Sequence, residues 1–195
     1  FSPADAPHGY YADFGWVAPA GSTIALPGPD TLWQTTASSL TPATPVTLTW
    51  DNGQGLVFSR RIAVDDRFMF TVTDSVANQT GAPVTLSPYG RITRIGAPHV
   101  EGIYVLHEGL IGYLGDQQLQ EITYKDMDKA KSKAFKDVTG GGWVGMTDKY
   151  WASAIIPDQN RSYSAAFGVT AAQTPIYESA AVAGGMTIAP GTTGE

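Results

Sequence analysis

The sequence predicts a mostly β fold in which antiparallel strands form a sandwich with little helix. Apolar residues recur at every second position through the middle of the chain, which is the strand period. Turn-forming segments separate these runs at short intervals, and 22 glycines and 13 prolines among 195 residues supply them. Regularly spaced strands and turns favour two packed sheets over an alternation of strands and helices.

The middle of the chain is expected to form an antiparallel meander. Residues 46–50, 56–64 and 68–76 alternate with period 2, and turn residues join them at 51–55 and 65–67. Another strand begins at Val84, and Pro88 places a bulge or an edge in it because proline cannot donate to a strand ladder. β-branched and aromatic residues, which suit a pleated and half-buried surface, fill these runs.

The pattern in the second half of the chain predicts further strands and one segment that is either a short helix or a loop. A hairpin is expected with Gly115 and Asp116 at its tip, and later strands over 163–169 and 176–188. Residues 127–138 are rich in Lys, Asp and Ala and are expected to form a short helix or a solvated loop, which the glycines at 140–142 end. The aromatic stretch 10–16 is expected to pack as a strand beside the sandwich, and residues 190–195 to form a turn with no strand after it.

The sequence predicts one domain over residues 1–195. A chain of this size buries roughly 70% of its unfolded surface, and no shift in composition marks a boundary. The chain begins with Phe1 rather than Met and stops in a turn, so the domain is expected to be truncated at both ends. No run approaches the roughly 20 apolar residues that a membrane-spanning helix needs.

The composition argues against several classes of function. A formal net charge of −6 is unfavourable for contacts with nucleic-acid phosphates. The absence of cysteine excludes disulfides and thiolate metal sites. The three histidines, at positions 8, 99 and 107, do not follow known zinc-ligand spacing, so no metal and no cofactor is expected.

One segment, from His99 to His107 and Glu108, resembles a catalytic set. A histidine acid and a carboxylate base can transfer a proton at a sugar carbon. No second motif orients either group, so a surface loop is the favoured interpretation and no catalysis is expected.

The aromatic residues Trp143, Tyr150 and Trp151 are the candidates for a ligand or partner groove. Core packing is the favoured interpretation of all three. The functional alternative is that one ring lines a groove for an apolar ligand.

Residues 141–157 read Gly-Gly-Trp-Val-Gly-Met-Thr-Asp-Lys-Tyr-Trp-Ala-Ser-Ala-Ile-Ile-Pro. This block resembles the late signature of the large periplasmic domain of the YidC membrane protein insertase family (the YidC/Oxa/Alb group). Seven further segments agree with the family in order, so the resemblance covers nearly the whole chain: 11–16, 46–61, 65–72, 83–90, 108–112, 124–126 and 189–194.

The resemblance implies a fold, a cellular location and a set of partners. The fold would be a twisted antiparallel β-super-sandwich, similar to galactose mutarotases and some carbohydrate-binding domains. The domain would lie in the periplasm, between the first and second membrane helices of a bacterial inner-membrane protein. Components of the Sec translocon and membrane-protein clients would be its partners, with a chaperone-like role for its groove.

The expected function is therefore that of a non-catalytic periplasmic domain that supports membrane protein insertion through contacts. The alternative is a carbohydrate-binding or mutarotase-like sandwich, with His99 or His107 facing a carboxylate across a cleft. The mutarotase active-site pattern is not recognisable in this sequence. A third possibility is a structural spacer.

Overall fold

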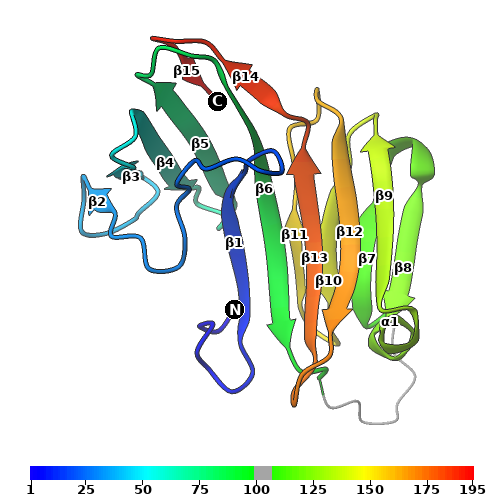
Figure 1. Cartoon of the computed structure of the whole chain (residues 1–195). Coiled ribbons are helices and arrows are strands. Elements are labelled where there is room, and N and C mark those ends of the chain that lie inside the picture. Colours follow the sequence, from blue (N-terminus) through cyan, green and yellow to red (C-terminus); the bar gives the residue numbers. More distant parts are fainter. Residues whose placement is uncertain (99–106) are drawn as a thin grey trace. The chain divides into compact units, whose positions relative to one another are not determined.

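A computed structural model describes residues 1–98 and 107–195 and confirms a mostly β fold with little helix (Figure 1). The described residues divide into two compact units, one formed by Phe1–Phe14 and Tyr89–Gly184 and the other by Gly15–Pro88 and Gly185–Glu195. That residues 1–195 act as one domain, and that the fold is mutarotase-like, both stay predictions.

The first unit contains two antiparallel sheets, with strand orders β1-β6-β13-β12-β9 and β11-β10-β7-β8. A 3-10 turn (η1, Gly115–Gln117) lies between β7 and β8, and a helix (α1, Tyr124–Ala130) follows β8. The strands are β1 (Tyr10–Val17), β6 (Val84–Ile95), β7 (Gly109–Tyr113), β8 (Leu119–Thr123), β9 (Ser132–Val138), β10 (Trp143–Thr147), β11 (Ala152–Ile155), β12 (Tyr163–Thr170) and β13 (Ile176–Ala183).

The two sheets of the first unit pack face to face and share one apolar core, and β12 shows most clearly how alternate side chains enter it. Along β12, Tyr163, Ala165 and Phe167 are buried, and the residues between them are exposed. The ring of Phe167 meets that of Phe135 on β9 edge-on, with centroids 5.6 Å apart. The opposite sheet contributes Leu110, Val144, Met146 and Ile155 to the same core.

The second unit is built on one antiparallel sheet of order β15-β5-β4-β3-β2, and β14 pairs with the first residues of β6. The strands are β2 (Gln34–Thr35), β3 (Val46–Asp51), β4 (Leu56–Val64), β5 (Phe70–Asn78), β14 (Met186–Ile188) and β15 (Thr193–Gly194). β3, β4 and β5 form the predicted meander. Pro88 lies between the part of β6 that pairs with β14 and the part that pairs with β13, as a strand interruption requires.

A small apolar core and two polar contacts hold the second unit together. Its buried residues are Trp16, Leu56, Phe58, Val76, Leu86 and Ile188. On the same face of the sheet, two residues along each strand from Phe58 and Val76, Arg60 on β4 donates to both carboxylate oxygens of Asp74 on β5, at 2.7 and 2.8 Å. Buried Asn78 donates through its amide nitrogen to the carbonyl oxygens of Ala82 and Ile188. The polar groups of this core are therefore satisfied by neighbours in sequence and in space.

Two sequence expectations are wrong. Residues 132–138 form strand β9 rather than helix or loop, because Phe135 and Val138 are buried while the polar residues around them stay exposed. A register shift between β9 and β12 breaks the period-2 pattern, so the strand cannot be recognised from the sequence periodicity. The final segment is not a bare turn, since Thr193 and Gly194 pair with Ala77 and Val76 of β5.

No helix in the described part of the chain is long and apolar enough to cross a bilayer.

The substitution Phe58→Ala should lower the free energy of unfolding of the second unit by about 3–5 kcal/mol, since a fully buried ring leaves a cavity. Phe68→Ala is the matched control in the same unit, because that ring is 81% exposed and its loss should cost at most about 0.5 kcal/mol. Urea unfolding followed by circular dichroism measures both. Equal losses would contradict the assigned core.

Candidate functional site

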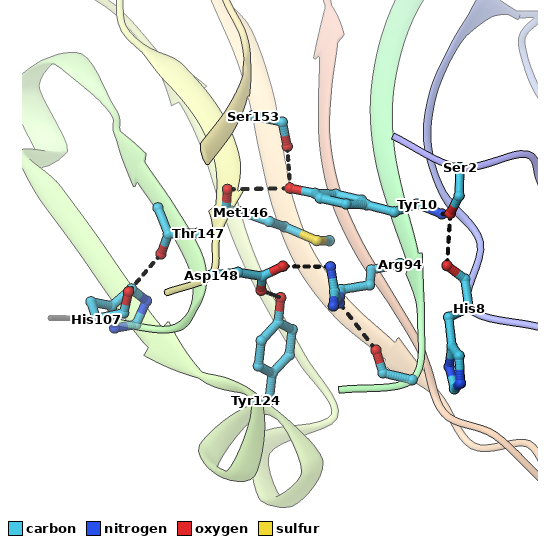
Figure 2. A network of polar contacts seen from close by, with 11 residues as sticks. Ser2, His8, Tyr10, Arg94, His107, Tyr124, Met146, Thr147, Asp148 and Ser153 are labelled. Carbon is cyan, nitrogen blue, oxygen red and sulfur yellow. Dashed lines mark hydrogen bonds and ion pairs between the residues drawn. The ribbon is translucent and has the colours of Figure 1, made fainter. Parts of the chain in front are cut away.

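A mostly buried polar network in the first unit surrounds the turn between β10 and β11 (Figure 2). Its centre is an ion pair in which Arg94 of β6 donates to Asp148, the residue that follows β10, with 2.5 Å between Nη1 and Oδ2. The two side chains are only 16% and 12% exposed. An ion pair removed from water to this extent makes each partner dependent on the other, because either charge alone would be costly to bury.

Every acceptor oxygen of this carboxylate is used. Figure 2 shows Asp148 between Arg94 and Tyr124, the first residue of α1, whose hydroxyl donates to Oδ1 at 3.0 Å. Burial, followed by the negative charge of Asp148, raises the pKa of the Tyr124 phenol above its usual value. Arg94 also donates through Nε to the carbonyl oxygen of Gly96 at 3.2 Å, so the ion pair is fixed at both ends.

A second tyrosine joins the network from β1. The hydroxyl oxygen of Tyr10 lies 2.5 Å from Oγ of Ser153 on β11, and the guanidinium carbon of Arg94 lies 4.9 Å from the centre of the Tyr10 ring. Burial raises the pKa of Tyr10 as well. Both phenols in contact with this ion pair therefore stay protonated near neutral pH, which makes them hydrogen-bond donors rather than general bases.

The ring of Tyr124 links the network to the apolar core. It meets the ring of Tyr177 on β13 edge-on, with centroids 4.7 Å apart. The Tyr177 hydroxyl donates to Asp128 of α1 at 2.9 Å, and burial together with this hydrogen bond raises the pKa of Tyr177 to about 12. The helix is thereby attached to both the turn and the sheet.

The feature that this network holds in place is the turn itself. The amide nitrogen of Asp148 donates to the carbonyl oxygen of Trp151 at 2.8 Å, which closes a turn with Lys149 and Tyr150 at its centre. Tyr150 is 78% exposed and Trp151 is 74% exposed. A rigid and neutralised base therefore carries two aromatic side chains into solvent.

The three aromatic candidates do not come together in one groove. Trp143 is half-buried at the first residue of β10, opposite Tyr113 on β7, whereas Tyr150 and Trp151 follow the last residue of that strand. Core packing is wrong for Tyr150 and Trp151, which face water at a turn. That one of the three rings contacts a ligand or partner stays a prediction.

The histidine candidates are placed only in part. His107 is half-buried, its Nε2 lies 3.0 Å from the carbonyl oxygen of Leu110, and its own carbonyl oxygen accepts from Thr147. His99 and its neighbours up to residue 106 lie outside the described residues. Within residues 1–98 and 107–195, no three His, Asp or Glu side chains are close enough together to hold a metal ion.

Sequence reasoning missed the Arg94 network, although one signal was present. Arg94 occupies the same strand face as Gly90 and buried Ile92, so the period-2 pattern places a charge on an inward position. A charge there requires a buried partner. The pattern does not reveal which carboxylate supplies it, because Asp148 is more than fifty residues away along the chain.

A shallow apolar trough of about 250 Å³ lies on the outer face of the β13-β12-β9 part of the sheet. Cross-strand pairing places small side chains side by side there, with Ala166 opposite both Ala180 and Ala134, and Ser164 opposite Val182. The longer side chains of Lys136 and Asp137 border the trough on β9, the edge strand. The trough forms because these short side chains leave a depression beside the longer ones.

Comparison with known proteins identifies the family. The chain matches the family described as the YidC periplasmic domain over residues 1–195. The chain belongs to this family. Curated members of the YidC family agree with it along its length.

The relatives share about half of their residues with the chain. A protein named "Membrane protein insertase YidC" from Beijerinckia indica subsp. indica is 52% identical over 195 residues, covering 99% of this chain and 32% of the relative. A protein of the same name from Nitrobacter hamburgensis is 52% identical over 196 residues, covering 100% and 32%, and one from Bradyrhizobium diazoefficiens is 54% identical over 168 residues, covering 86% and 27%. The chain thus spans about a third of the length of the YidC relatives that it matches.

The substitution Asp148→Ala should lower the free energy of unfolding by about 2–4 kcal/mol, because it leaves the Arg94 guanidinium mostly buried without a carboxylate. The control is Asp158→Ala, which removes a half-exposed carboxylate paired with Arg161 and should change stability by at most about 0.5 kcal/mol. Urea unfolding midpoints report both variants. Equal midpoints would show that the ion pair does not hold the turn.

Stability should fall in alkaline solution because the folded state keeps protons on its buried phenols. An unfolded tyrosine ionises near pH 10, whereas Tyr177 in the folded state ionises near 12, so its contribution is complete below about pH 10 and is lost as pH rises toward 12. Tyr177→Phe should flatten this loss, and Tyr113→Phe, at a more exposed ring, is the matched control. Thermal unfolding from about pH 9 to about pH 12, with phenolate absorbance recorded, measures the slope. An unchanged slope in Tyr177→Phe would contradict the assignment.

Proposed function

We propose that this chain is the periplasmic domain of a bacterial inner-membrane protein insertase, and that it acts by contact rather than by catalysis. The whole-length match to the YidC periplasmic domain family carries the proposal. The relatives' shared name, membrane protein insertase, supports the location beside a membrane. Membrane-protein clients and components of the Sec translocon are the proposed partners.

The trough on the β13-β12-β9 face is the proposed contact site for clients. Its lining includes the small apolar side chains of Ala134, Ala166, Ala180 and Val182, so it offers apolar surface without a deep pocket. An extended segment with apolar side chains would bury them there and gain roughly 25 cal/mol for each Å² of apolar surface removed from water. A shallow site of this kind accepts many sequences, which suits a surface that meets varied clients.

The Arg94 network supports a role without catalysis. Both oxygens of Asp148 are engaged, and the phenols of Tyr10 and Tyr124 have raised pKa values. Groups that are fully committed to one another position a loop instead of transferring protons. The family match gives no support to the sugar-binding alternative.

Photocrosslinking from the trough tests the proposal in the full-length protein in its membrane. A crosslinker at Ala166 should capture a stalled nascent chain of a defined membrane-protein client or a translocon component, because this residue lies within the apolar lining. The same group at Asp158, an exposed turn residue in the same unit, is the control and should capture much less. Equal capture from both positions, or none from Ala166, would refute the trough as the contact site.

A further inference from the structure

Neither core packing nor turn geometry in their unit explains why Tyr150 and Trp151 are aromatic and exposed. They lie in a turn, where glycine, asparagine, aspartate and proline are the residues with a backbone advantage, and they take no part in the core. Each ring leaves most of a large apolar surface in water. Contiguous exposed apolar groups of this size mark contact sites.

The base of the turn is more firmly held than an ordinary surface loop. Asp148 is bonded to Arg94 on β6 and to Tyr124 on α1, and its backbone pairs with Trp151 across the turn at 2.8 and 3.4 Å. Ser153, two residues further along, is bonded to Tyr10. The rings are thus presented on a preformed support, which reduces the entropy that binding would cost.

The chemistry of the turn matches the interfacial layer of a phospholipid bilayer. Tryptophan and tyrosine concentrate there because each combines an apolar ring with one polar group that stays hydrated. Lys149 places its ammonium group 5.2 Å from the centre of the Tyr150 ring, and a lysine beside aromatic rings complements lipid phosphates. Asp148, the carboxylate at the base of the turn, is neutralised by Arg94 inside the unit.

A second exposed apolar turn in the other unit provides a contrast. Phe68, Met69 and Phe70 are also exposed, but they follow Asp65, Asp66 and Arg67, which together carry a net negative charge. Phenylalanine lacks the polar group that anchors a ring at the headgroup level, and adjacent carboxylates are repelled by anionic lipids. Phe68, which is 81% exposed, therefore serves as an internal control of similar exposure and different chemistry.

We propose that the Lys149-Tyr150-Trp151 turn is a membrane-surface anchor whose two rings enter the headgroup layer of a phospholipid bilayer. The proposal rests on the proposed function for the presence of a bilayer beside the chain, and adds the element that touches it. Two rings give a modest affinity that an excess of vesicles makes measurable, and attachment of the chain to a membrane would raise the local concentration of the anchor at the bilayer.

Flotation of the 195-residue chain with vesicles of phosphatidylethanolamine and phosphatidylglycerol tests the anchor. The double variant Tyr150→Ser, Trp151→Ser should partition about tenfold less than the unmodified chain, because both inserted rings are lost. Phe68→Ser, the control, should partition like the unmodified chain.

Fluorescence quenching tests whether the Trp151 ring itself enters the bilayer. Vesicles made with brominated acyl chains should quench tryptophan fluorescence of the unmodified chain, and Trp151→Phe should lose most of that quenching while still floating with the vesicles. Near-ultraviolet circular dichroism of each variant checks that the fold is retained.

Three outcomes would overturn the anchor. They are absence of vesicle binding, equal binding by the double variant, or undiminished quenching in Trp151→Phe. A dimer in sedimentation velocity that the double variant abolishes, without vesicle binding, would make the turn an interface between copies and would equally overturn it. Vesicle binding needs no client, so its failure leaves the crosslinks from Ala166 intact, and failure of those crosslinks leaves vesicle binding intact.

Discussion

The first unit depends on one buried ion pair. Arg94 and Asp148 come from opposite sheets, and their contact adds a directional bond to an otherwise non-directional apolar core. Because both charges are largely shielded from water, the sheets cannot slide past each other without exposing or stranding one of them. Tyr124 extends the same constraint to α1, so sheet, helix and turn share a single fixed point.

Much of the fold was predictable because its strands obey period 2 and their turns carry the expected residues. The meander of β3, β4 and β5 and the hairpin around Gly115 follow directly from that pattern. Strand β9 did not, since its buried residues Phe135 and Val138 are three apart across a register shift. The start of α1 did carry a local signal, because Thr123 and Asp126 cap each other as a Thr-x-x-acid pair.

The candidate site was less predictable because it is assembled from distant parts of the chain. The sequence singled out Tyr150 and Trp151 but assigned them to the core, since an aromatic residue in an apolar segment is most often buried. Only the long-range pairing of Asp148 with Arg94 explains why the segment turns there and leaves both rings outside. Local patterns cannot encode such a pairing when its members lie on different sheets.

The lysines of β9 have a consequence for any chain that lies in the trough. Lys133 and Lys136 project from an edge strand, and the side chain of Gln117 already occupies the carbonyl oxygen of Lys136. An incoming polypeptide would therefore find this acceptor already engaged and could not pair with the edge strand at Lys136. A client in the proposed trough would then be held there mainly through its side chains, which favours a short-lived contact over a permanent one.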